Sequence, residues 1–239
     1  MTPKYLISII IPVLNEAAII ESTLERLTEN PHVEIIVVDG GSSDRTVDLA
    51  QQMTGVTVII VANLGRAAQM NAGAAMARGK YLLFLHVDTR LPVNYSELVR
   101  ETLIQPEVIA GAFELGIDSQ AKSLRLVEFF VKMRSHLCSL PYGDQAIFLT
   151  KKVFVEIGGF PDLPIMEDFE LIQRLKSQGK IAIAPAKIIT SPRRWQKLGV
   201  WRTTLINQLV IFGYYLGISP VKLKNFYRGS QKKRQGDLA

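Results

Sequence analysis

Residues 81–89 read Tyr-Leu-Leu-Phe-Leu-His-Val-Asp-Thr, and this stretch decides how the rest of the chain is interpreted. Its first five residues form an unbroken apolar and aromatic run, which is typical of a parallel strand covered on both faces. His86 and Asp88 follow two positions apart, so in extended chain their side chains share one face. Open α/β sheets bind ligands just outside the carboxyl ends of their strands. A divalent cation holding a diphosphate would suit this pair; a turn-capping Asp88 beside a core histidine is the alternative.

Segments typical of strands and helices alternate along the first 90 residues or so. Apolar runs predict strands at 5–13, 34–39, 56–61 and 81–85, and the intervening segments predict helices at 17–27, 45–53 and 65–78. This alternation indicates a parallel sheet with right-handed crossovers. No Gly-x-Gly-x-x-Gly follows a strand and no Walker lysine motif is present, so an ordinary dinucleotide fold lacks its phosphate fingerprint.

The second half of the chain is less regular. It predicts strands at 108–115, 144–150, 181–183 and 188–190, and helices at 95–104, 124–137, 152–157 and from 165 to about 179.

Composition restricts the class of protein and its partners. The 239 residues are 48% hydrophobic and 21% charged, which predicts a packed domain rather than a disordered chain. The single Cys138 excludes an intrachain disulfide and a zinc site built from cysteines, and a reducing, cytoplasmic setting is expected. A net charge of +6 favours anionic partners. The basic residues are scattered rather than interleaved with aromatic residues, so nucleic acid is not expected among them.

Four motifs, taken in order, resemble landmarks of the family-2 glycosyltransferases with the GT-A fold. They are the opening turn at 12–16, the nucleotide loop Val-Val-Asp-Gly-Gly-Ser-Ser-Asp at 37–44, His-Val-Asp at 86–88 in place of Asp-x-Asp, and the catalytic acidic pair at 167–168. The resemblance extends from Ile7 to about Leu175.

Two further features narrow the resemblance within the family. Ser191 stands where a Gln-x-x-Arg-Trp motif would have its glutamine, and this, with the absence of multiple membrane spans, argues against a processive polysaccharide synthase. The Gly-Arg-Ala-Ala-Gln-Met-Asn stretch at 65–71 and His86 resemble a small branch of the family, some members of which carry a carotenoid-glycosyltransferase label.

The resemblance implies an α/β fold of the GT-A type, with a Rossmann-like, mostly parallel sheet flanked by helices. Residues 1–198 would form the glycosyltransferase domain, with a nucleotide-binding half over about 1–92 and an acceptor half over about 93–198. An amphipathic helix and a basic tail would follow over 199–239.

The resemblance also implies which residues bind the nucleoside-diphosphate sugar. Pro12 and Glu16 would lie at the nucleotide, with Glu16 on the ribose hydroxyls, and Asp39 would accept a hydrogen bond from the base. A carboxylate suits both tasks because it only accepts hydrogen bonds. A first-turn helix acid for Glu16 and a loop cap for Asp39 are the alternatives. Arg66 begins a helix, where a cation opposes the helix dipole, so an anion or base is expected beside it.

Two further residues are expected at the donor. Arg194 and Trp195, together with Arg193, would close over the diphosphate or stack on a sugar; a solvated basic loop is the alternative.

The expected metal ligands are Asp88 and His86, with Mn²⁺ or Mg²⁺ as the cation. His86 would favour a softer cation such as manganese or would touch only the sugar. Asp168, paired with Glu167, would be the general base of an inverting hexosyltransferase, and repulsion from Glu167 and Glu170 would raise its pKa. The alternative is that the acidic pair simply favours the start of a helix.

The C-terminal stretch Trp201 to Leu216 is apolar, contains two tyrosines and is flanked by cations that continue to Lys232-Lys233-Arg234. Such a segment suits a helix lying on an anionic inner membrane face, with a lipid or carotenoid acceptor. A core-packing or dimer-forming helix with a basic tail is the alternative. Two competing functions remain open: a non-catalytic, membrane-associated protein that binds nucleotide sugars, and a sugar nucleotidyltransferase.

Overall fold

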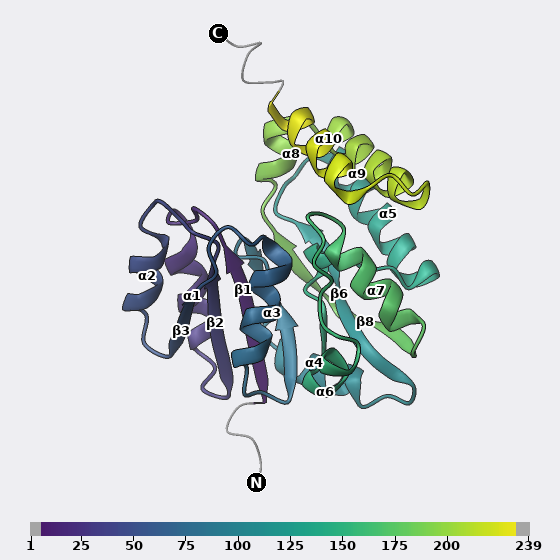
Figure 1. Ribbon diagram of the computed structural model, residues 1–239. Coiled ribbons are helices and arrows are strands. Elements are labelled where there is room, and N and C mark those ends of the chain that lie inside the picture. Colours follow the sequence, from purple (N-terminus) through teal and green to yellow (C-terminus); the bar gives the residue numbers. More distant parts are fainter. Residues whose placement is uncertain (1–5, 233–239) are drawn as a thin grey trace.

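The computed structural model describes residues 6–232, whose strands form a single eight-stranded sheet (Figure 1). The strands are β1 (Ile7–Val13), β2 (Val33–Asp39), β3 (Val56–Ile60), β4 (Tyr81–Phe84), β5 (Thr89–Arg90), β6 (Val108–Ile117), β7 (Phe148–Thr150) and β8 (Lys180–Thr190). Their order across the sheet is β3-β2-β1-β4-β7-β6-β8-β5. β3, β2, β1 and β4 are all parallel, β6 and β8 are parallel, and β7 and β5 run antiparallel to their neighbours. The predicted mostly parallel α/β sheet is confirmed.

Helices cover both faces of this sheet. They are α1 (Ile20–Thr28), α2 (Thr46–Gln52), α3 (Arg66–Met76), α4 (Tyr95–Leu103), α5 (Lys122–Cys138), α6 (Lys151–Glu156), α7 (Glu167–Lys176), α8 (Arg193–Leu198), α9 (Val200–Tyr215) and α10 (Pro220–Lys232). Apolar side chains of α1, α2, α4 and α5 pack on one face, and those of α3, α6 and α7 pack on the other.

The isoleucines of β1 show why the first strand is apolar throughout. Ile9 and Ile11 point into the core under α1, whereas Ile10 points into the core under α3, and all three are fully buried. Alternate side chains of a strand leave opposite faces, so a strand with helices on both sides needs no polar position. Each of these buried side chains contributes about 1.5–3 kcal/mol to folding.

Several predicted elements differ from the structure. The two short strands predicted after Lys180 are one strand, β8, in which the pairing to β6 shifts so that Pro185 and Ala186 have no partner residues. Proline has no N–H for the ladder, and an irregularity of this kind accommodates it. The strand predicted from Asp144 begins only at Phe148, because a 3₁₀ turn spans Gly143–Gln145.

The C-terminal helices α8, α9 and α10 lie over the carboxyl-end edge of the sheet, beside α5 and α7 (Figure 1). Their inner side packs on α7 through a small cluster that includes Phe169, Val210 and Leu223. The sequence predicted a basic tail where the structure has α10, while Lys233 and Arg234 lie outside the described residues. Within residues 6–232, no helix is both long enough and apolar enough to cross a bilayer.

Candidate active site

A cleft of about 980 Å³ opens where the carboxyl ends of β1, β2 and β4 face helices α7 to α10. Pro12, Glu16, Arg66 and Asp88 line its sheet side, and Asp168, among others, lines its opposite side. The volume is at the upper end of the range for sites that bind small molecules. The topology therefore gathers most of the predicted site residues around one cavity.

Arg193, the first residue of α8, closes one part of this cleft. Its two Nη atoms bind the two carboxylate oxygens of Glu16 at 2.6 and 2.7 Å, and its Nε lies 2.9 Å from Oδ2 of Asp88. Burial, together with the Glu16 carboxylate, raises the pKa of Asp88 above its ordinary value although Arg193 opposes this. One guanidinium thus occupies the two carboxylates that were assigned to the ribose and to the cation.

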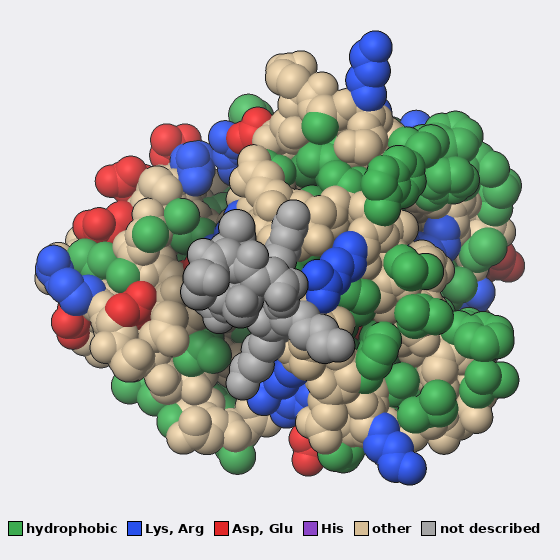
Figure 2. Space-filling view, turned by 90° about the horizontal axis from the view of Figure 1, so that it is seen from above, with side chains coloured by type: hydrophobic (Ala, Val, Ile, Leu, Met, Phe, Trp, Pro, Cys, Tyr) green, Lys and Arg blue, Asp and Glu red, His purple; other side chains and the backbone are tan. Residues whose placement is uncertain are grey.

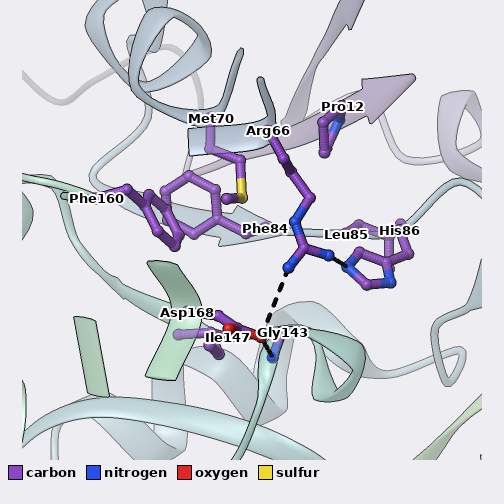
Figure 3. A pocket seen from close by; sticks show the side chains of 10 residues that line it. All are labelled: Pro12, Arg66, Met70, Phe84, Leu85, His86, Gly143, Ile147, Phe160 and Asp168. Atoms are coloured by element: carbon purple, nitrogen blue, oxygen red, sulfur yellow. Dashed lines mark hydrogen bonds and ion pairs between the residues drawn. The ribbon is translucent and has the colours of Figure 1, made fainter. Parts of the chain in front are cut away.

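Arg66 closes the centre of the cleft. Its Nε lies 2.5 Å from Oε1 of Glu167, its Nη2 lies 3.8 Å from Oδ2 of Asp168, and its Nη1 lies 3.2 Å from Nε2 of His86. Figure 3 shows the guanidinium reaching from the start of α3 to His86 on one side and toward Asp168 on the other. These two carboxylates, from a segment about 100 residues away, compensate for a cation at a helix N-terminus.

His86 is a neutral imidazole in this arrangement. Burial, assisted by the Arg66 charge, lowers its pKa to about 3. Guanidinium nitrogens only donate hydrogen bonds, so Nε2 of His86 accepts one and the ring proton is on Nδ1. A cation cannot use Nε2 while Arg66 faces it.

The side chains at this site therefore provide one metal ligand, Asp88, rather than two. Among residues 6–232, no three His, Cys, Asp or Glu side chains converge as a metal site would require. Asp88 is still compatible with Mg²⁺, which is commonly held by one or two carboxylates together with substrate phosphates and water. His86 does not fit as a ligand in this conformation.

Asp168 lies at the first turn of α7 with its carboxylate fixed by backbone groups. The N–H of Gly143 donates to Oδ2 and the N–H of Phe169 donates to Oδ1, both at 2.8 Å. Burial would raise the pKa of Asp168, but Arg66 and these two N–H groups outweigh it and hold the pKa below its ordinary value. The carboxylate is therefore ionised at neutral pH.

The expected increase in the pKa of Asp168 is wrong, and the structure gives the reason. Glu167 is paired with Arg66, so its charge is compensated. Glu170 points elsewhere, since its Oε2 accepts a hydrogen bond from Tyr214 at 2.9 Å and its Oε1 lies 3.5 Å from Arg174.

Three other predicted residues are held in place by contacts within the protein. Asp39 is 1% exposed, and its carboxylate accepts hydrogen bonds from the backbone of Gly41 and Ser42 and from the Ser42 hydroxyl, as the loop-cap alternative expects. Trp195 touches the cleft but is only 9% exposed and belongs to the main core. Arg194 lines the cleft and binds Oδ1 of Asn207 at 2.7 Å.

The segment before β7 supplies a further residue of the cleft and a buried residue that supports it. Asp144 lines the cleft, and its Oδ1 is buried without a hydrogen-bond partner among residues 6–232. Burial raises the pKa of this carboxyl group. The next residue, Gln145, is fully buried and binds Arg134, Ser135 and the carbonyl oxygen of Phe113. Polar residues between two apolar segments were the only local signal.

Known proteins share both the sequence pattern and the fold. The sequence profile described as "Glycosyl transferase family 2" matches residues 8–160. An uncharacterized glycosyltransferase of Haemophilus influenzae is 29% identical over 186 residues, which cover 71% of this chain and 62% of that protein. A PGL/p-HBAD biosynthesis glycosyltransferase of Mycobacterium bovis is 37% identical over 91 residues, which cover 35% of this chain and 36% of that protein. The chain thus spans less than two thirds of the length of either relative.

A solved structure has the same fold. The crystal structure of S. aureus TarS 1-349 in complex with UDP matches with a TM-score of 0.60 at 16% identity, covering 82% of this chain and 63% of that one. At this identity the similarity concerns the fold alone.

Proposed function

The chain belongs to glycosyl transferase family 2, and from this premise we propose that it transfers a hexose-type sugar, with inversion, from a UDP-linked donor to an acceptor hydroxyl or carboxyl group. The nucleotide would bind over residues 1–92 and the acceptor over residues 93–198. The observation that carries the proposal is the ionised, backbone-held carboxylate of Asp168 in the cleft at the carboxyl ends of the strands. Sites of open α/β sheets lie at this edge.

In the proposed reaction, Asp168 is the general base. Its carboxylate takes the proton of the acceptor as the acceptor oxygen bonds to the anomeric carbon, and the bond from that carbon to the diphosphate breaks. The electron pair of the broken bond leaves with the nucleoside diphosphate. Attack from the side opposite to the leaving group inverts the configuration. Two fixed N–H donors keep the carboxylate in one orientation, which is what a base needs in order to meet its proton.

Donor binding would rearrange Arg193. Glu16 is proposed to hold the ribose hydroxyls, and Asp88 is proposed to lie beside the diphosphate; both carboxylates are bound by Arg193 at present. A guanidinium released from them could bind phosphate oxygens in the same two-pronged way. We propose that Arg193 exchanges the carboxylates for the diphosphate when the donor enters.

Arg66 has a related role in this proposal. It lies between His86 and the acidic pair, and its charge favours the ionised form of Asp168 that a general base requires. A divalent cation held by Asp88 would supply further charge neutralisation for the diphosphate.

The proposal is tested by measuring UDP released from UDP-glucose, UDP-galactose and UDP-N-acetylglucosamine, with GDP-mannose as a comparison donor, in Mn²⁺ or Mg²⁺. Asp168→Asn is compared with Asp162→Asn, a change of the same kind in the loop before α7. Turnover that only Asp168→Asn abolishes supports the proposal. Nucleotide binding without turnover of any donor, even with lipid extract as acceptor, would contradict it and favour a non-catalytic binding protein.

A further inference from the structure

An apolar stripe on α5 faces outward. Leu126, Phe129, Phe130, Met133 and Leu137 are all exposed, and their spacing places them on one side of the helix. The opposite side of α5 packs on the sheet through apolar side chains that belong to the main core. A helix on the surface of a globular domain normally presents polar residues to water.

A second outward stripe lies on α9, which packs against both α5 and α10. It consists of the exposed residues Trp201, Leu205, Leu209, Phe212 and Leu216, the last at the C-terminal end of the helix. Figure 2 shows hydrophobic side chains gathered on the side of the molecule that α5, α9 and α10 occupy in Figure 1. The two stripes together are called the outer apolar face.

Helix α9 has apolar residues on both its outer and its inner side. Thr204, Asn207 and Gln208 line the cleft together with apolar Val210 and Ile211, whereas the exposed apolar stripe of the same helix points away from it. A surface helix that only covered a hydrophobic core would have a polar outer side, which α9 lacks along this stripe. The wall between the outer apolar face and the cleft is one helix thick, because α5 also contributes to both, through Val131 on the inside.

The C-terminal helices beside this face carry charges of one sign. The sequence contains no Asp or Glu between Glu170 and Asp237, so α8, α9 and α10 carry cations only. Exposed Lys222 and Arg228 lie on α10, and Lys122 lies at the start of α5. Within residues 6–232, no carboxylate pairs with Lys222 or Arg228.

We propose that the outer apolar face docks on an anionic lipid bilayer and that a lipid acceptor reaches the cleft from that bilayer past α5 and α9. The part that concerns the acceptor rests on the proposed function. Apolar and aromatic side chains enter the interfacial region of the bilayer, and the surrounding cations bind anionic headgroups. The arrangement brings a lipid-attached hydroxyl to Asp168 without removing the apolar part of the lipid from the membrane.

Charge favours a bilayer over a second copy of the chain. In a twofold dimer the same patch meets itself, so the cations around one face would approach those around the other. An anionic membrane surface attracts these cations instead, at about 1 kcal/mol for each one near the surface.

The experiment is vesicle flotation of the whole chain, without turnover. Vesicles of phosphatidylcholine are compared with vesicles that also contain about 30% phosphatidylglycerol, at low and high salt. The test variant combines Leu205→Gln and Phe212→Gln, which are 60% and 62% exposed and do not line the cleft. The matched control combines Ile104→Gln and Val155→Gln, which are 63% and 66% exposed and lie near α4 and α6 at the far end of the molecule.

We expect salt-sensitive binding to the anionic vesicles by the wild-type chain and the control, and binding at least about tenfold weaker by the test variant. Lys222→Gln should weaken binding about fivefold. Far-ultraviolet circular dichroism and thermal unfolding show that each variant is folded.

Two outcomes would overturn the docking proposal. One is equal binding by the test and control variants. The other is a dimer in light scattering that only the test variant loses, with no vesicle binding, which would assign the face to a second copy. UDP release is followed in parallel, with a water-soluble acceptor and with lipid extract as acceptor. Turnover without vesicle binding refutes the docking alone, whereas vesicle binding without any turnover refutes the proposed function alone.

Discussion

Arg193 holds both carboxylate oxygens of Glu16, at 2.6 and 2.7 Å, although the two residues are 177 positions apart in the sequence. The pair joins the turn after β1 to the start of α8 and thereby ties the C-terminal helices to the nucleotide half. Arg193 also contacts Asp88, so it is paired with both carboxylates that the proposed function assigns to the donor. In that proposal the donor replaces these ion pairs, and the first prediction tests this exchange.

The variant Arg193→Gln should change the binding of uridine and UDP in opposite directions. Uridine should bind more tightly, since Glu16 is then free for the ribose. UDP should lose a cationic phosphate contact worth about 1.5–3 kcal/mol. The dissociation constant of uridine divided by that of UDP, both measured by calorimetry, should therefore fall by at least about tenfold. An unchanged ratio would refute the proposed exchange of partners, and Lys197→Gln, at the end of the same helix, is the control.

Gly143→Ala should disturb the base without removing it. A Cβ at this position would lie 2.9 Å from Oδ2 of Asp168, too close for a carboxylate that is also bound by the Gly143 N–H. We expect kcat to fall about tenfold to a hundredfold while the affinity for UDP is retained, because the base moves away from the acceptor. Gly229→Ala, where the added Cβ meets nothing within 4 Å, is the matched control. Equal kcat values for the two variants would contradict the assigned position of the base.

His86 should remain neutral in mildly acidic solution. Its pKa of about 3 lies below the ordinary histidine value of about 6.5, so the imidazole stays uncharged at pH 5. Because Nε2 accepts from Arg66, the proton should be on Nδ1. Nitrogen-15 chemical shifts of the ring, followed from pH 8 to pH 4, measure both properties. Exposed His136 serves as an internal comparison, and a midpoint near pH 6.5 for His86 would refute the described arrangement.

Glu34 should stabilise the fold in a pH-dependent way. Its buried carboxylate accepts hydrogen bonds from Ser8 and from the backbone N–H and side chain of Arg78. Burial would raise the pKa of Glu34, but these donors outweigh it and hold the pKa below its ordinary value. A lowered carboxyl pKa contributes stability above the unfolded-state pKa of about 4.3, and this stability is lost as the pH falls through the folded-state pKa.

We therefore expect Glu34→Gln to lower the free energy of unfolding by about 2 kcal/mol at pH 7, and by less near pH 3. Urea denaturation at several pH values measures the difference. Glu25→Gln, on the exposed side of α1, should have little effect at either pH. A loss for Glu34→Gln that is the same at both pH values would contradict the linkage.

Local sequence was sufficient for most elements in the first half of the fold. The run Ile35 to Val38 predicts β2 because its consecutive apolar residues indicate a strand that is buried on both faces. Helix α10 was missed because the cations after Pro220 were interpreted as a basic tail. Ser219 and Pro220 are residues that commonly begin a helix, and they were the local signal that could have identified it.

The candidate site was also only partly predictable from local sequence. The motifs identified Glu16, Asp88 and Asp168, and the structure places all three around one cleft. The pairing of Arg66 with Glu167 spans 101 positions, and no local pattern encodes it. The lowered pKa of Asp168 follows from that long-range cation, which is why repulsion between neighbouring carboxylates predicted the wrong direction.

The most direct test of the central proposal is the rate of UDP release by Asp168→Asn, with UDP affinity measured on the same preparation. An asparagine keeps the size of the side chain but cannot accept the acceptor's proton. We predict that kcat falls at least about a hundredfold while the dissociation constant for UDP stays within about threefold of the wild-type value. A variant that releases UDP at the wild-type rate would show that Asp168 is not the base and would contradict the proposed mechanism.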